Sequence, residues 1–227
     1  MNHRKKPFSL LAASATLACA ALLPVHAQTA PLAAAPAAAA SAAAPRLSML
    51  PAASPAALVA HASAYKGRFA STCQSLDANL HFIDSMELTP TAVGPVLDAR
   101  YRKALYTAAN CSEASRLVTL NLPKASWTFN GQASVSGKTV DLVTVVGKAG
   151  PITAAIAQPG KVEETADKIV VRYGEAGELP IAKSMDDAND KALRLLEDGR
   201  LYQGNDAPLS ASGYPAALNL DSFYTKQ

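Results

Sequence analysis

The sequence predicts an α+β fold: an N-terminal helical hairpin clamped by a disulfide, an antiparallel β-meander of five or six strands, and a C-terminal helix with an extended tail. Three observations predict it. Apolar residues recur at steps of three and four between Leu58 and Cys111, which would place them on one helix face. After Cys111 apolar and polar residues alternate, as in half-buried strands. Ser184-x-x-Asp187 then resembles a helix cap.

The first 27 residues have the features of a secretory signal peptide. Residues 4–6 are basic, residues 8–25 are uncharged and mostly apolar, and residues 25–27 place small side chains where a signal peptidase cleaves. We therefore expect residues 1–27 to be removed and the mature protein to be periplasmic or secreted. The alternatives are a retained membrane anchor and lipidation at Cys19, where the Leu of a lipoprotein signal is one position out of place.

The formal net charge of +3 belongs to this leader. Its removal takes three of the 21 Lys and Arg residues and none of the acidic ones, which leaves 18 basic against 18 acidic residues. Surfaces that bind nucleic acid or anionic membranes carry excess positive charge. We expect no nucleic-acid partner, and no membrane span after signal cleavage.

Residues 28–54 are nearly all Ala, Pro and Ser, with Arg46 as the one charge. Such a composition has too few apolar side chains for a core, and its prolines disfavour an alanine-rich helix, so it predicts a disordered linker. The linker would be either a functional spacer or a compositional accident. Residues 55–227 are expected to form a single globular α+β domain.

The predicted hairpin consists of a helix over residues 55–86, capped by Ser54, and a second over residues 95–110. Each would carry one cysteine, Cys73 or Cys111, on its apolar stripe. In an oxidising compartment two such cysteines normally form a disulfide. The alternative is a reactive thiol, but neither cysteine lies in a Cys-x-x-Cys pair.

Short strands separated by turn residues are expected after the hairpin. The predicted strands are 118–122, 126–130, 139–146, 152–157 and 168–173. Asn130-Gly131 is a strong hairpin-turn signal. A helix is then expected from Ser184 to Asp198, ended by Gly199, with the apolar tail from Leu201 packed across the domain or, alternatively, exposed as a docking strip.

The best candidate for acid–base chemistry is His81 with Asp77 and Asp84, which would share one face of the predicted first helix. The alternative interpretation is a solvated salt bridge. No metal site is expected, because His61 and His81 are too far apart along one helix and the acidic run 186–190 lacks the central Gly of a calcium loop. No cofactor motif is present either.

Three functions remain open at this point. The first is an exported, non-enzymatic binding or adaptor protein of the cell envelope with a protein partner. The second is a carrier of a small apolar ligand or lipid, in a cavity between sheet and helices that Trp127 and Phe129 would line. The third is an envelope hydrolase that uses His81. The sequence makes an enzyme the less favoured class, because it contains none of the common catalytic motifs.

Overall fold

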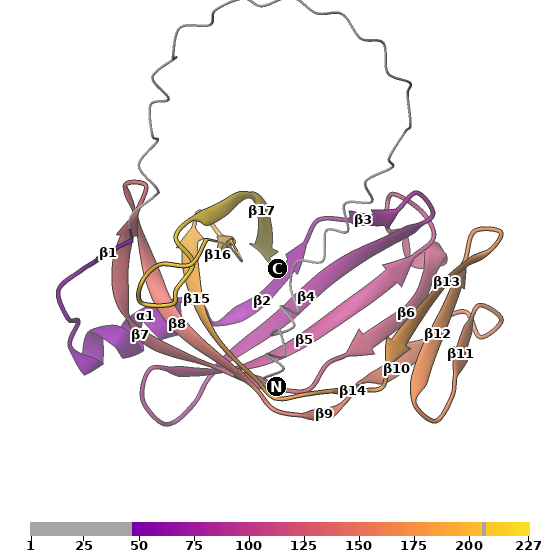
Figure 1. Ribbon diagram of the computed structural model, residues 1–227, viewed down its shortest axis with the longest axis horizontal. Coiled ribbons are helices and arrows are strands. Elements are labelled where there is room, and N and C mark those ends of the chain that lie inside the picture. Colours follow the sequence, from indigo (N-terminus) through magenta and orange to yellow (C-terminus); the bar gives the residue numbers. More distant parts are fainter. Residues whose placement is uncertain (1–46, 206–207) are drawn as a thin grey trace, which may run out of the picture.

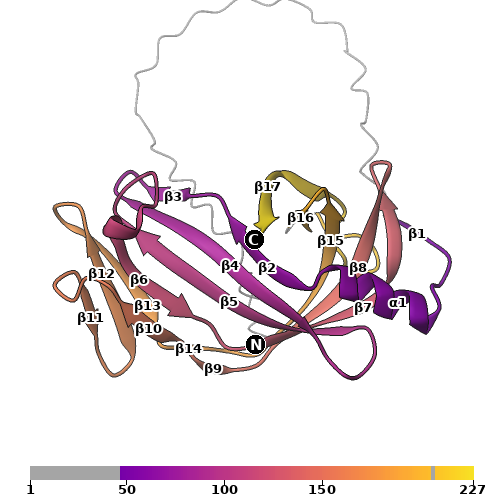
Figure 2. The same ribbon diagram turned by 180° about the vertical axis from the view of Figure 1, so that it is seen from behind.

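The computed structural model describes residues 47–205 and 208–227, and these are built mainly from antiparallel strands (Figures 1 and 2). The predicted signal peptide, Cys19 and residues 28–46 of the predicted linker lie outside the described residues. Within residues 47–54, Ser48–Met49 form strand β1, which pairs with β7.

Eight strands close into a barrel. The barrel closes because Val96–Ala99 of β5 pair with Ala125–Thr128 of β7. Around the barrel the strands are β7 (Ala125–Val135), β8 (Lys138–Gly147), β15 (Ala188–Glu197), β16 (Arg200–Gly204), β17 (Leu218–Lys226), β2 (Gly67–Ser71), β4 (Leu80–Pro90) and β5 (Val96–Tyr106).

Further strands extend the sheet on one side of the barrel. The far half of β5 pairs with β6 (Arg116–Asn121), which pairs with β10 (Thr153–Ile156), and β3 (Gln74–Asp77) pairs with β4. A small sheet of β11 (Val162–Glu164), β12 (Lys168–Tyr173) and β13 (Gly177–Ala182) stands beside β6 and β10, at the opposite end of the molecule from α1 (Figure 1). β9 (Gly150–Pro151) and β14 (Ser184–Met185) form a short pair.

The helix α1 (Pro55–Ala64) confirms the predicted start of the first helix. The Ser54 side chain accepts a hydrogen bond from the Ala57 backbone N–H at 3.2 Å, and Pro55 occupies the first turn. The helix ends at Ala64, however, and Gly67 begins β2 with a φ of +142°. The predicted length of this helix is therefore wrong.

The predicted helical hairpin is wrong, because residues 67–106 form strands β2 to β5. The reason is visible in β5, where buried Leu97 and Ala99 alternate with exposed Asp98 and Arg100. Buried and exposed side chains therefore alternate with a period of two, as in a strand. Over a longer stretch, apolar residues spaced three and four apart also match a helix, and the prediction followed that spacing. The disulfide between Cys73 and Cys111 is nevertheless present, with a Cα–Cα distance of 5.7 Å, and it joins two loops.

The predicted C-terminal helix is also wrong, since residues 188–197 form β15. Asp198-Gly199, interpreted as the end of a helix, is the two-residue turn of the β15–β16 hairpin. Its φ angles of 51° and 72° match a type I′ turn, which suits the twist of antiparallel strands. The predicted tail contributes β16 and β17 to the barrel instead of crossing a finished domain.

The five strands predicted between residues 118 and 173 fall close to β6, β7, β8, β10 and β12, but they do not form a separate meander. Asn130-Gly131 is no turn. It lies inside β7 at a register shift between Phe129 and Gly131, and the chain turns at Ser136-Gly137 instead. The fold is a barrel with a side sheet, not the expected α+β arrangement.

Three apolar clusters fill the interior of the described part of the chain, and the smallest, around Ala133, Leu142 and Leu193, joins β7, β8 and β15. The first fills the barrel under α1 with large side chains, among them Tyr65, Phe69, Trp127 and Phe129, each at most 2% exposed. The second lies between β6, β10 and the small sheet and contains Leu117, Ile152, Ile169 and Val171. Its neighbours on β13 and β14 are only partly buried.

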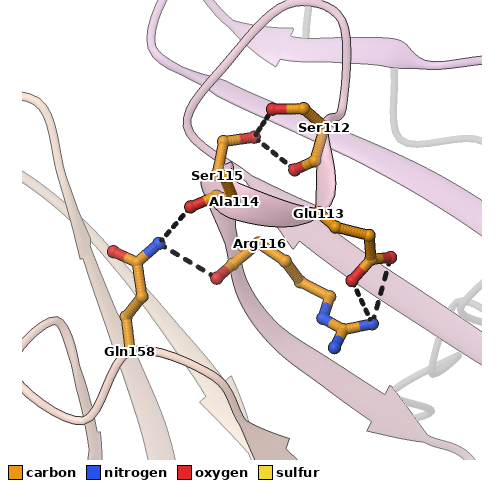
Figure 3. A network of polar contacts seen from close by, with 6 residues as sticks. All are labelled: Ser112, Glu113, Ala114, Ser115, Arg116 and Gln158. Atoms are coloured by element: carbon orange, nitrogen blue, oxygen red, sulfur yellow. Dashed lines mark hydrogen bonds and ion pairs between the residues drawn. The ribbon is translucent and has the colours of Figure 1, made fainter.

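A polar network holds the loop after the disulfide against the β10–β11 connection (Figure 3). The Gln158 side-chain amide donates to the backbone carbonyls of Ala114 and Arg116 at 3.3 and 3.1 Å. Arg116 Nη1 lies 2.9 Å from a carboxylate oxygen of Glu113. These contacts connect the start of β6 to the chain that leads into the small sheet.

Candidate functional site

A cavity of about 880 Å³ is lined mostly by barrel strands, from β4, β5, β7 and β8 to β15, β16 and β17, and on one side by β13 of the small sheet. That volume is within the range of small-molecule binding sites. Most of its wall is apolar and comes from both structures; the main apolar residues are Phe82, Leu105, Leu120, Leu122, Ile152, Leu179, Ile181 and Met185. Leu76 and Leu209 also line it and are 43% and 60% exposed, so apolar side chains reach from the cavity to the surface.

The alternation of β13 supplies one wall. Leu179 and Ile181 are half-buried and line the cavity, whereas the alternate residues Glu178, Pro180 and Ala182 are exposed. The register pairs Leu179 with Val171 and Ile181 with Ile169 on β12, whose side chains belong to the second cluster. The small sheet therefore turns one apolar face toward the cavity.

An ion pair from neighbouring strands also lines the cavity. Lys103 Nζ lies 2.9 and 3.1 Å from the two carboxylate oxygens of Asp84, and 3.9 Å from the centroid of the Phe82 ring. Burial raises the pKa of the Asp84 carboxyl, although the charge and hydrogen bond of Lys103 act in the opposite direction. Each charge of this pair thus has its partner.

Arg194 of β15 lines the cavity and is 4% exposed. Its guanidinium carbon lies 4.6 Å from the Trp127 ring centroid, and Nη1 donates to the Leu193 carbonyl at 3.0 Å. Its buried Nε has no hydrogen-bond acceptor among the described residues. Desolvation lowers the pKa of this guanidinium.

Three more polar side chains surround this arginine in the cavity wall. Gln203 of β16 is its register partner, and the Gln203 Nε2 is likewise buried without an acceptor in the described part of the chain. Tyr101 and Tyr224 also line the cavity, and Trp127 Nε1 donates to the Tyr101 hydroxyl at 2.6 Å. Burial raises the pKa of both tyrosines, so their hydroxyls stay protonated at neutral pH.

A second polar cluster joins α1 to the barrel and is separate from the cavity lining. The Tyr65 hydroxyl donates to Asp141 at 2.7 Å, and Gln132 donates to the other oxygen of Asp141 at 3.0 Å. His61 Nδ1 lies 3.7 Å from that same oxygen. Burial and the neighbouring carboxylate raise the pKa of Tyr65, so its proton remains on the hydroxyl. We interpret this cluster as structural.

The proposed acid–base trio is divided by the strands. His81 and Asp84 both lie on β4, three residues apart, and side chains at that spacing point to opposite faces of a strand. Asp77 lies on β3 opposite Leu80. Although desolvation opposes it, hydrogen bonds from Asn79 and other neighbours hold the pKa of Asp77 below its ordinary value. Asp84 instead pairs with Lys103.

The ligand-binding candidates Trp127 and Phe129 are 0% and 2% exposed and belong to the packed barrel cluster. Trp127 does not itself line the cavity, but it donates a hydrogen bond to Tyr101 and stacks on Arg194, and both of these residues line it. Sequence reasoning missed Arg194, Gln203 and the β13 wall. One signal was available, a lone arginine in the apolar run Ala192–Leu196.

Among residues 47–205 and 208–227, no group of three or more His, Cys, Asp or Glu side chains is arranged to hold a metal ion. No helix in this part of the chain is long and apolar enough to cross a membrane. No family model, curated protein or solved structure matches the chain.

Proposed function

We propose that this protein is an exported, non-enzymatic binding protein that carries a small apolar ligand in the cavity that the barrel strands and β13 line. The observation that carries the proposal is the cavity itself, about 880 Å³ in volume with walls that are mainly apolar. Apolar surface that water would otherwise contact favours an apolar occupant. Export is proposed from the basic and apolar leader in residues 1–27.

The arrangement of the wall supports binding more than collapse. Leu179, Ile181 and Met185 are partly buried although they face the second cluster, so each leaves apolar surface that a ligand would cover. Burial of such surface contributes about 25 cal/mol per Å². A ligand that covers these side chains therefore gains binding free energy in proportion to the apolar area that it removes from water.

The test is a titration of the full chain with dodecan-1-ol, followed by the fluorescence of Trp127, the one tryptophan. Trp127 contacts two cavity-lining residues, Tyr101 and Arg194, so its emission should shift and saturate as the alcohol binds. Ala192→Phe places a benzyl group in the cavity and should abolish the shift, because Ala192 lines it.

The matched control is Ala182→Phe, the same substitution at an exposed position of β13. It should leave the titration unchanged. A flat response of the unmodified chain would overturn the proposal, as would equal binding by the chain carrying Ala192→Phe when near-UV circular dichroism shows that this variant is folded.

A further inference from the structure

Two buried hydrogen-bond donors in the cavity wall lack acceptors, and they lie side by side. Arg194 and Gln203 are register partners on β15 and β16. Arg194 Nε and Gln203 Nε2 are both buried, and neither has an acceptor among the described residues. Buried polar groups in folded proteins nearly always have partners, and a buried arginine is normally paired with an acid.

The neighbouring carboxylates do not fill this role. Asp141 is the register partner of Arg194 on β8, but its two oxygens accept hydrogen bonds from Tyr65 and Gln132. Asp84 pairs with Lys103. No ion pair within 4.0 Å joins Arg194 to a carboxylate in the described part of the chain. One buried positive charge thus remains without a counter-charge.

We infer that the ligand of the cavity is an amphiphile with an acidic headgroup, a carboxylate or a phosphate, bound by Arg194 and Gln203. This inference rests on the proposed function. The planar guanidinium presents N–H donors in a fork that matches the oxygens of either headgroup. The Gln203 amide and the protonated Tyr101 and Tyr224 hydroxyls add neutral donors beside it.

The rest of the cavity fits the other end of such a molecule. The walls away from Arg194 are formed by apolar residues of β5, β6 and β13, including Leu105, Leu120 and Ile181. The ion pair of Asp84 with Lys103 is neutral overall, and the other charged side chains of the lining besides Arg194 are three bases and one acid, so the wall as a whole does not repel an anion; they are Arg102, Lys148, Lys191 and Asp190. An acyl or alkyl chain along these walls would cover their apolar surface. Its acid group at Arg194 would accept hydrogen bonds from the unpaired donors of Arg194 and Gln203.

The experiment is calorimetric titration of the full chain at neutral pH with four probes of one chain length: dodecanoate, dodecyl phosphate, dodecan-1-ol and dodecyltrimethylammonium. We expect at least one of the two acids to bind about tenfold more tightly than the alcohol, the size of one charge-assisted hydrogen bond. The cation should bind most weakly. The tighter acid identifies the headgroup.

Arg194→Gln should remove the preference for the acid and leave the affinity for the alcohol within about threefold, since the alcohol makes no ion pair. Arg200→Gln, a matched change at an exposed position on β16, should keep the preference. If Arg194→Gln does not fold, Gln203→Met is the second variant. It removes one neutral donor, so we expect the preference for the acid to fall about threefold.

Two failures are distinguishable. If the alcohol and the acids all fail to bind the unmodified chain, the proposed function falls and this inference falls with it. If the alcohol binds but neither acid binds more tightly, or if the preference survives in folded Arg194→Gln, the cavity is still a binding site and the headgroup assignment alone is overturned.

Discussion

The two ends of the molecule use the same alternation of apolar residues to opposite effect. Under α1, aromatic side chains from several strands fill the barrel, and Tyr65 and Phe129 lie with their ring centroids 5.1 Å apart. Beyond the middle of β5 the buried apolar side chains are mainly aliphatic, and the partly buried Leu179 and Ile181 line a cavity of about 880 Å³. The first end is close-packed, whereas the second contains a packed cluster and, beside it, a cavity that reaches back to the barrel residues Tyr101 and Tyr224.

The two ends differ in the partner strand of β5. At the packed end β5 pairs with β7, which draws the strands into a closed ring that large side chains fill. At the second end β5 pairs with β6, and the small sheet packs against both strands through the second cluster. The cavity lies beside this contact, and Leu179 and Ile181 of the small sheet line it because they are only partly buried.

The largest expected effect is the loss of a side chain at the packed end. Leu97 is fully buried in the barrel cluster, so Leu97→Ala should leave a cavity and lower the free energy of unfolding by about 3–5 kcal/mol. Urea unfolding measures this. A loss below about 1 kcal/mol would show that this end is not close-packed.

Removal of the disulfide should come next. Cys73 and Cys111 are 38 residues apart, and replacing both by Ser should lower the unfolding free energy by about 2–4 kcal/mol, chiefly through the greater freedom of the unfolded chain. The comparison is between oxidised protein and the double variant in urea. Equal midpoints for the two would contradict a stabilising role for this bond.

The same Leu→Ala change in the cavity wall should lower the free energy of unfolding much less. Leu179 is half-buried on the cavity wall, so Leu179→Ala removes fewer contacts and should cost about 1 kcal/mol. The pair of variants measures the contrast between the two ends directly. Equal destabilisation by Leu179→Ala and Leu97→Ala would show that Leu179 is fully packed and does not border a cavity.

The smallest effect concerns pH. Burial raises the pKa of Asp84 in the folded chain above its ordinary value of 3.8, so the folded state holds this proton more tightly than the unfolded state. The stabilising contribution of the protonated carboxyl is present at low pH and is lost as the pH rises from 3.8 through the raised pKa.

Urea unfolding at a series of pH values, with Asp84→Asn as reference, tests this. The stability of the unmodified chain relative to the variant should fall across that pH window. A relative stability that rises there instead would mean that Lys103 outweighs the desolvation of Asp84.

The sequence permitted part of this fold to be predicted. The start of α1 follows from Ser54 and Pro55, and the β-branched run at β8 was recognised as a strand because such residues favour extended structure. The Cys73–Cys111 bond followed from cysteine count and compartment. The disulfide is confirmed, although the segments predicted as helices are strands and both cysteines lie in loops.

The remainder depended on pairings that no local pattern specifies. Residues 188–197 carry Ala, Leu, Arg and Glu, all good helix formers, yet pairing with β8 and β16 on both sides makes them a strand. The Asp198-Gly199 hairpin signal was present and was assigned to a helix end. The juxtaposition of Arg194 and Gln203 arises only once that hairpin is formed.

The proposal that decides the others is that the cavity receives an amphiphilic ligand. A crystal structure of the full chain grown with 12-bromododecanoate tests it most directly, because the anomalous signal of bromine locates the end of the chain. The account predicts a bromine peak between the walls formed by Leu120 and Ile181, with the carboxylate at Arg194. A structure of crystals grown with a saturating concentration of the acid that shows no bromine peak in the cavity would contradict it.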